Sequence, residues 1–98
     1  MLSNLPLDLK KLDKEKSDYA VLRAAIMAEL DAINLYEQLA AYTDSEVLKE
    51  VLLDVAREEK THAGEFQTML LKLDKEQVEE KKEAKEEIEE LLEELKNK

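Results

Sequence analysis

Hydrophobic residues recur at alternating steps of four and three along two stretches of the chain. This spacing places side chains on one face of an α-helix. It predicts a first helix from Ser17 or Asp18 to about Tyr42 and a second from Val47 to about Leu73, and both faces are expected to pack in a core. The first series is Leu22, Ile26, Glu29, Ile33, Tyr36 and Ala40, and the second is Leu48, Leu52, Val55, Glu59, His62, Phe66, Met69 and Leu73.

The break between the two helices is expected at residues 43–46, which read Thr-Asp-Ser-Glu. Either Asp44 or Ser45 is a suitable cap for the second helix, because a short side-chain oxygen accepts a hydrogen bond from the first helical turn. A connection this short joins antiparallel neighbours. Residues 17–73 therefore predict an antiparallel helical hairpin.

The two ends of the chain differ from this hairpin in composition. Residues 1–16 contain the sole proline, Pro6, and are expected to form an irregular lead-in. Residues 74–98 are mostly Glu and Lys, and this predicts a charged third helix that packs on a neighbouring subunit or serves as a spacer, with a frayed single helix as the alternative. Its narrow apolar stripe consists of Ala84, Ile88, Leu91, Leu92 and Leu95.

Composition agrees with an all-α fold in a single domain spanning residues 1–98. The chain has one glycine, 41% charged residues and a formal net charge of −10. The negative charge argues against nucleic acid and anionic membranes as partners. The absence of cysteine excludes disulfides, zinc–thiolate sites and iron–sulfur clusters. Because no signal peptide or membrane-spanning run is recognisable, we expect a cytoplasmic protein.

Three ionisable residues interrupt the apolar series: Glu29 in the first helix, and Glu59 and His62 in the second. Burying them without compensation would cost several kcal/mol, and a metal cation compensates both carboxylate and imidazole. Glu29 and Glu59 each lie roughly 20 Å from the turn at a rise of about 1.5 Å per residue, so the hairpin brings them to the same height. We therefore expect Glu29, Glu59 and His62 to be metal ligands.

This ligand set is half of a known arrangement. Di-iron carboxylate proteins of the four-helix class take a Glu from each of two helices and a Glu-x-x-His from each of two others. The chain supplies one Glu and one Glu-x-x-His from two core helices. A symmetric homodimer would supply the full set and cover the exposed apolar faces.

The donor types limit which metal such a site would hold and which neighbours would assist it. Glutamate and imidazole suit Fe(II), Mn(II) and Zn(II), and disfavour copper. We expect Glu29 or Glu59 to bridge two metals, His62 to be a terminal ligand, and Tyr36 to hydrogen-bond a ligand carboxylate. Two further acids, Glu58 and Glu65, flank the series; they either attract incoming cations or are ordinary solvated charges.

Two sequence patterns resemble a known family, the encapsulated ferritins. These are half-length ferritin-like proteins housed in encapsulin nanocompartments. The patterns are Glu29-Leu-Asp-Ala-Ile-Asn-Leu-Tyr36 and, about thirty residues later, Glu58-Glu-Lys-Thr-His-Ala63. The resemblance covers roughly residues 18–73.

The resemblance implies a catalytic site and an assembly. It implies a ferroxidase centre between two subunits that completes a ferritin-like four-helix bundle, with Glu29, Glu59 and His62 as ligands and Tyr36 beside them. It further implies dimers arranged in a ring, commonly a decamer, which use oxygen or peroxide and pass oxidised iron to the lumen of an encapsulin shell.

The sequence departs from that family pattern in two places. Some members carry an acidic residue immediately before the Glu29 position as part of a metal uptake site. Here that residue is Ala28, so that of this site only Asp31 is retained. The final residues also lack the Gly-, Leu- and Ser-rich segment that docks cargo to the shell, so the chain resembles either a trimmed cargo protein or a member fused to its shell.

Two other functions compete with the ferroxidase interpretation. A non-catalytic dimerisation module would use the buried acids and His62 to set the register of its helices. A di-iron peroxidase of the rubrerythrin type is disfavoured because no cysteine-based electron-transfer module is present.

Overall fold

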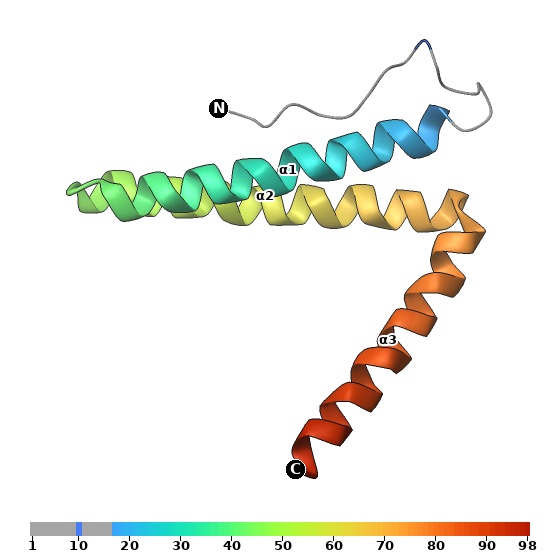
Figure 1. The fold of residues 1–98 in the computed structure, drawn as a ribbon. Coiled ribbons are helices and arrows are strands. Elements are labelled where there is room, and N and C mark those ends of the chain that lie inside the picture. The colour runs from blue at the N-terminus through green and yellow to red at the C-terminus, as the bar shows by residue number, and fades with distance from the viewer. Residues whose placement is uncertain (1–9, 11–16) are drawn as a thin grey trace.

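The computed structural model describes residue 10 and residues 17–98, and this part consists of helices without strands. Helix α1 (Ser17–Tyr42) and helix α2 (Glu46–Leu73) lie antiparallel, side by side. Helix α3 (Lys75–Lys96) leaves the far end of α2 at an angle, which gives the molecule an L shape (Figure 1). The predicted all-α fold is confirmed. The expected lead-in at residues 1–16 lies outside the described residues, apart from residue 10.

The turn between α1 and α2 is closed by side chains of the break itself. Of the two candidate caps, Ser45 has this role, because its hydroxyl accepts a hydrogen bond from the Leu48 amide at 3.2 Å. Thr43 Oγ1 in turn accepts a hydrogen bond from the Ser45 amide at 3.2 Å. These bonds satisfy amides that would otherwise lack partners, so the chain reverses within three residues.

The packing face of α2 is displaced from the series that the sequence predicted. The expected core positions Leu48 and Met69 are 48% and 53% exposed, and the His62 side chain is 48% exposed. Helix α1 instead covers the neighbouring edge of the apolar face, where alanines allow the backbones to approach closely. The buried apolar residues of the hairpin are Leu22, Ile33 and Ala40 in α1, and Ala56, Ala63 and Leu70 in α2.

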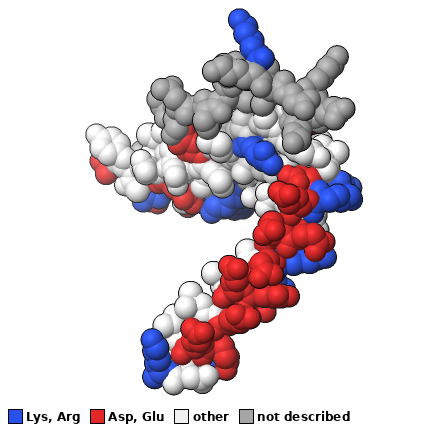
Figure 2. Space-filling view, turned by 45° about the vertical axis from the view of Figure 1, so that its right-hand side comes forward, with Lys and Arg blue, Asp and Glu red and all other residues white. Residues whose placement is uncertain are grey.

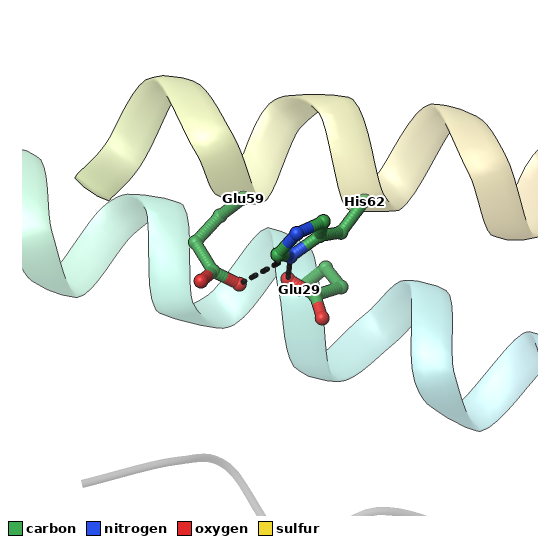
Figure 3. Close-up of side chains that lie close together, drawn as sticks. All are labelled: Glu29, Glu59 and His62. Carbon is green, nitrogen blue, oxygen red and sulfur yellow. Dashed lines mark ion pairs between the residues drawn. The ribbon is translucent and has the colours of Figure 1, made fainter. Parts of the chain in front are cut away.

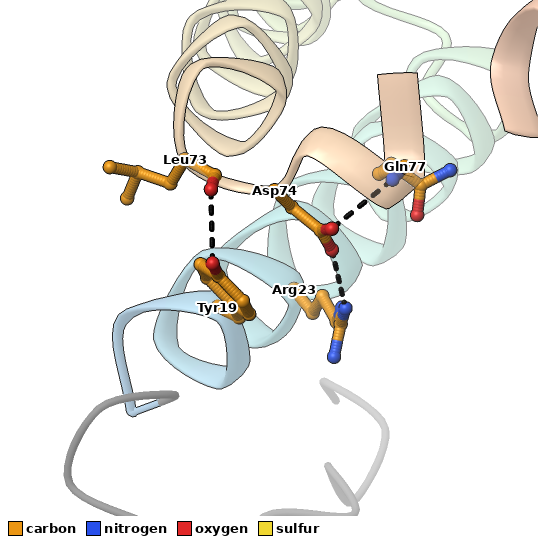
Figure 4. A network of polar contacts seen from close by, with 5 residues as sticks. All are labelled: Tyr19, Arg23, Leu73, Asp74 and Gln77. Carbon is orange, nitrogen blue, oxygen red and sulfur yellow. Dashed lines mark hydrogen bonds and ion pairs between the residues drawn. The ribbon is translucent and has the colours of Figure 1, made fainter. Parts of the chain in front are cut away.

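The bend between α2 and α3 is organised by Asp74, the one buried charged residue in the described part of the chain. Its Oδ1 accepts a hydrogen bond from the Gln77 amide at 3.1 Å and so caps α3. Its Oδ2 pairs with Arg23 Nη2 of α1 at 2.9 Å (Figure 4). Next to it, the Tyr19 hydroxyl donates to the Leu73 carbonyl at 3.0 Å. Three helices are thereby joined at one corner.

Beyond this corner α3 has no buried residue. Acidic side chains follow much of its length, as Figure 2 shows. No helix in the described part of the chain is long and apolar enough to cross a membrane.

Candidate metal centre

The hairpin brings Glu29 of α1 together with Glu59 and His62 of α2, near the middle of both helices (Figure 3). Glu59 and His62 are three residues apart, so they leave the same side of α2 about one turn apart. Ala56 and Ala63 are buried against α1, and these small side chains let Glu29 approach α2. Ligand atoms of the three side chains all lie within 4.8 Å of one another.

The distances within this cluster are too long for hydrogen bonds and suitable for a shared ion. His62 Nδ1 lies 3.7 Å from Glu29 Oε2 and 3.8 Å from Glu59 Oε2. Two ligands that each lie about 2.0–2.2 Å from one first-row metal ion are roughly 3–4 Å apart. The side chains therefore leave room for a cation between them.

One atom of the cluster lacks the partner that its burial requires. Glu29 Oε2 is buried without a hydrogen bond, and the Glu29 side chain is only 19% exposed. A buried unpaired acceptor costs about 1–3 kcal/mol, more if it is charged. A bound cation would compensate this oxygen directly, so the donor set and its environment both fit a metal ion.

The cluster is open on one side, and the open side is apolar. His62 lies in the middle of a stripe along α2 whose members fall within about 40° of it around the helix at 100° per residue. Apart from the exposed Glu58 at its edge, the stripe comprises Leu48, Val51, Val55, Phe66, Met69 and Leu73, of which Leu48, Val51, Met69 and Leu73 are 45–54% exposed. We call it the α2 stripe.

The other predicted site residues lie farther from the cluster. Tyr36 is half-buried two turns along α1 from Glu29, and no hydrogen bond joins it to the three ligand candidates in the described part of the chain. Asp31 lies about 200° around α1 from Glu29, so its side chain leaves another side of the helix. Glu58 and Glu65 are exposed and flank His62 at about 40° and 60° around α2.

The sequence analysis missed one contact beside the centre. Lys60 Nζ of α2 pairs with Glu37 Oε2 of α1 at 3.1 Å, directly after Glu59 in the chain. Residues 37 and 60 are far apart in sequence, and no local pattern pairs them. At the matched heights of the predicted hairpin the two residues lie about 12 Å apart along the axis at 1.5 Å per residue, so the sequence carries no signal for this pair.

A helical hairpin that presents two carboxylates and one imidazole from facing helices defines a ferritin-like class of half-bundle. Comparison with known proteins agrees. The rubrerythrin family model matches residues 20–98, so the chain belongs to the rubrerythrin family. A solved structure of an encapsulated ferritin domain from Pyrococcus furiosus superimposes with a TM-score of 0.79 at 52% identity, covering 93% of this chain and 95% of that one.

Two sequence relatives extend this result. The chain is 64% identical over 62 residues to a ferritin-like–encapsulin shell fusion protein of Pyrococcus furiosus, covering 63% of this chain and 18% of the relative. It is 46% identical over 57 residues to the encapsulin nanocompartment cargo protein EncC of Myxococcus xanthus, covering 58% of this chain and 44% of that protein. The chain thus spans less than half the length of either relative. The predicted resemblance to encapsulated ferritins is confirmed.

Proposed function

We propose that this domain is a ferroxidase that oxidises Fe(II) to Fe(III) at a di-iron centre formed between two chains. The observation that carries the proposal is the incomplete cluster on an apolar face. Glu29, Glu59 and His62 converge within 4.8 Å, yet His62 opens onto the exposed α2 stripe. A complete single-chain site would be enclosed by its own helices.

The ligand candidates have distinct parts in this proposal, in which iron is the substrate. The carboxylates of Glu29 and Glu59 are anionic oxygen donors, and they stabilise Fe(III) more than Fe(II) because the ferric ion has the higher charge. His62 supplies a nitrogen donor held on the same helix face as Glu59. Two ferrous ions give up one electron each, and the pair of electrons, with two protons, reduces oxygen to hydrogen peroxide or hydrogen peroxide to water.

A second copy of the chain completes the site in this proposal. Two hairpins related by a two-fold axis supply two Glu and two Glu-x-x-His motifs, which is the full ligand set of the four-helix di-iron class. The same contact covers the α2 stripe of both chains. Apolar burial at about 25 cal/mol per Å² then provides the free energy that holds the two halves of the site together.

The wider setting belongs to the same proposal. The names of both sequence relatives refer to encapsulin, and this supports a location inside an encapsulin nanocompartment whose shell protein is the partner. On the basis of the resemblance to encapsulated ferritins, we also propose that the dimers assemble into a ring, a decamer. We infer that oxidised iron passes from the shared centre to the lumen of the compartment.

An anaerobic Fe(II) titration followed by exposure to air tests the centre. We expect about one iron per chain, association of hairpins through the α2 stripe coupled to binding, and rapid appearance of Fe(III) absorbance. Glu59→Ala and His62→Ala should abolish both binding and rapid oxidation, because each removes a ligand from both metals of a symmetric pair. Glu50→Ala, an exposed glutamate of the same helix, is the matched control and should behave as the parent chain.

The result also separates the competing functions. Oxidation no faster than in buffer, without stoichiometric binding, would favour a non-catalytic dimerisation module. The family match gives specific support to a second candidate, a rubrerythrin-like di-iron peroxidase. Sustained turnover of peroxide with an added electron donor would identify that activity, whereas a ferroxidase stops when Fe(II) is consumed.

A further inference from the structure

Helix α3 carries a third series with alternating steps of three and four, and this series faces solvent. Its first members are Val78, Lys81 and Lys85, and its last are Ile88, Leu92 and Leu95. The three last side chains belong to residues that are 55–61% exposed. Burial of these apolar side chains against a partner would stabilise the helix by about 25 cal/mol per Å². The series, which we call the α3 series, therefore needs a partner.

A groove of about 670 Å³ lies at the bend between α2 and α3, where the α3 series begins. Leu71 of α2 and Val78 form part of its apolar wall, while Lys81, Lys82 and Lys85 line it from α3. Ala84, Ile88 and Glu89 complete its lining. The first half of the series thus offers an apolar surface bordered by cations, which suits an apolar and acidic helix.

The second half of the same helix has that chemistry. Residues 86–94 contain six glutamates and no lysine, together with Ile88, Leu91 and Leu92. The lysines of α3 before this segment are Lys75, Lys81, Lys82 and Lys85. Figure 2 shows the acidic side chains following α3 away from the bend. Residues 75–85 contain four glutamates beside these four lysines and carry no net charge, so negative charge and the larger apolar side chains are concentrated in the second half of the helix.

We propose that α3 pairs antiparallel with α3 of a second copy, around a two-fold axis between residues 86 and 87. Val78 then packs on the partner's Leu95, Lys81 on the partner's Leu92, and Lys85 on the partner's Ile88, and each contact occurs twice by symmetry. The lysine stems lie on the leucines while their ammonium groups reach the surrounding glutamates. The groove at the bend receives the end of the partner helix.

Charge complementarity selects the antiparallel orientation. A parallel pair in register would place Lys81 and Lys85 on the same lysines of the partner, and would set six glutamates beside six. In the antiparallel pair, Lys82 flanks the seam opposite the partner's Glu89, and Ala84 lies opposite the partner's Leu91. Lys82 and the partner's Glu89 meet twice by symmetry along one edge of the seam, while Ala84 and the partner's Leu91 make the other edge apolar.

This pairing uses a surface different from that of the metal centre and does not rest on the proposed function. The α2 stripe and the α3 series lie on separate arms of the L (Figure 1). Each chain then has two separate two-fold contacts. The pairing is expected in the absence of metal, so its failure and the failure of the metal centre are distinguishable.

Disulfide trapping tests the pairing, because the full chain has no native cysteine. Two single-cysteine chains, Lys81→Cys and Leu92→Cys, are mixed without metal and oxidised with diamide. The antiparallel pair places these two positions opposite each other, so we expect a mixed 81–92 disulfide, identified by mass. Neither variant alone should crosslink, since equivalent positions are about 16 Å apart along the axis at 1.5 Å per residue.

A matched control uses Glu83→Cys and Glu90→Cys. Residues 83 and 90 are as far from the proposed two-fold axis as each other, so the antiparallel pair brings them to the same height, as it does residues 81 and 92. Both lie on the face of α3 opposite the α3 series, so they should give little mixed disulfide. Self-crosslinking of Lys81→Cys and of Leu92→Cys would instead demonstrate a parallel pair. Equal yields of the mixed 81–92 and 83–90 disulfides would mean that the α3 series contacts another segment or stays exposed to solvent. Either result overturns the proposal.

A charge exchange provides the second measurement. Lys82→Glu should dissociate the pair in analytical ultracentrifugation, because it sets two acids together at both symmetry-related Lys82–Glu89 contacts. The double variant Lys82→Glu with Glu89→Lys restores opposite charges and should restore association. Loss of association in both variants to the same extent would contradict the assigned register.

Discussion

Among the residues of the cluster, Glu29 has the clearest unfavourable contribution to stability. Its Oε2 is buried without a hydrogen bond, while His62 Nδ1 stays 3.7 Å away. The neighbouring Glu59 adds a second negative charge to the same cluster. Such an arrangement destabilises the metal-free chain, and in our proposal a bound cation reverses the balance.

Glu29→Gln should therefore stabilise the protein without metal and remove its response to metal. The amide abolishes one buried negative charge at nearly constant shape, so we expect the free energy of unfolding of the metal-free protein to rise by about 1 kcal/mol. Denaturant unfolding with and without Zn(II), a redox-inert probe, measures both effects.

The exposed Glu50→Gln serves as control and should retain the increase in stability caused by Zn(II). If Glu29→Gln destabilised the metal-free chain instead, Glu29 would have a compensating interaction and the argument from its unpaired oxygen would fail.

At the scale of the elements, the corner at Asp74 determines how α3 is attached. One carboxylate caps α3 and binds Arg23 of α1 at the same time. The sequence carried a signal for the cap, since Asp74 followed three residues later by Gln77 is a capping-box pattern. No sequence pattern linked Asp74 to Arg23, which lies 51 residues earlier.

Two substitutions separate the cap from the ion pair. Asp74→Ala removes both and should cost about 1 kcal/mol or somewhat more, because the N-cap alone contributes about that amount and Arg23 is half exposed. Asp74→Asn keeps an acceptor for the Gln77 amide and loses only the charge.

Hydrogen exchange at the Gln77 amide reports the cap. We expect faster exchange in Asp74→Ala and nearly unchanged exchange in Asp74→Asn. Equal acceleration in both variants would show that the ion pair with Arg23, and not the cap, protects the start of α3.

At the scale of the whole molecule, the proposed assembly depends on the α2 stripe. Met69 is 53% exposed within that stripe and does not contribute to the buried core of the hairpin. Met69→Glu should leave the helical circular dichroism of the chain unchanged. It should weaken association through the α2 stripe, because it places a charge in an apolar contact, and slow iron oxidation about tenfold or more.

Met27→Glu is the matched control. Met27 is 40% exposed on α1 and lies about 160° around that helix from Glu29, away from the cluster. It should retain dimerisation and oxidation, measured by analytical ultracentrifugation and Fe(III) absorbance. Full activity of Met69→Glu as a monomer would contradict a centre shared between chains.

The sequence by itself determined the helices, the turn and the meeting of three side chains. Helical periodicity and matched distances from residues 43–46 depend only on local geometry, so Glu29, Glu59 and His62 could be predicted to converge, and the structure brings them together. Their role as metal ligands stays a prediction. Three other features required the tertiary structure.

Those features are the displaced packing face of α2, the Lys60–Glu37 pair, and the attachment of α3 through Asp74 and Arg23. The apolar face of α2 is wider than one helix can cover, and periodicity alone does not say which edge α1 will occupy. That choice follows from the closest approach allowed by Ala40, Ala56 and Ala63. The edge that α1 covers depends on how the surfaces of α1 and α2 fit together. This fit leaves His62 at the open edge of the cluster.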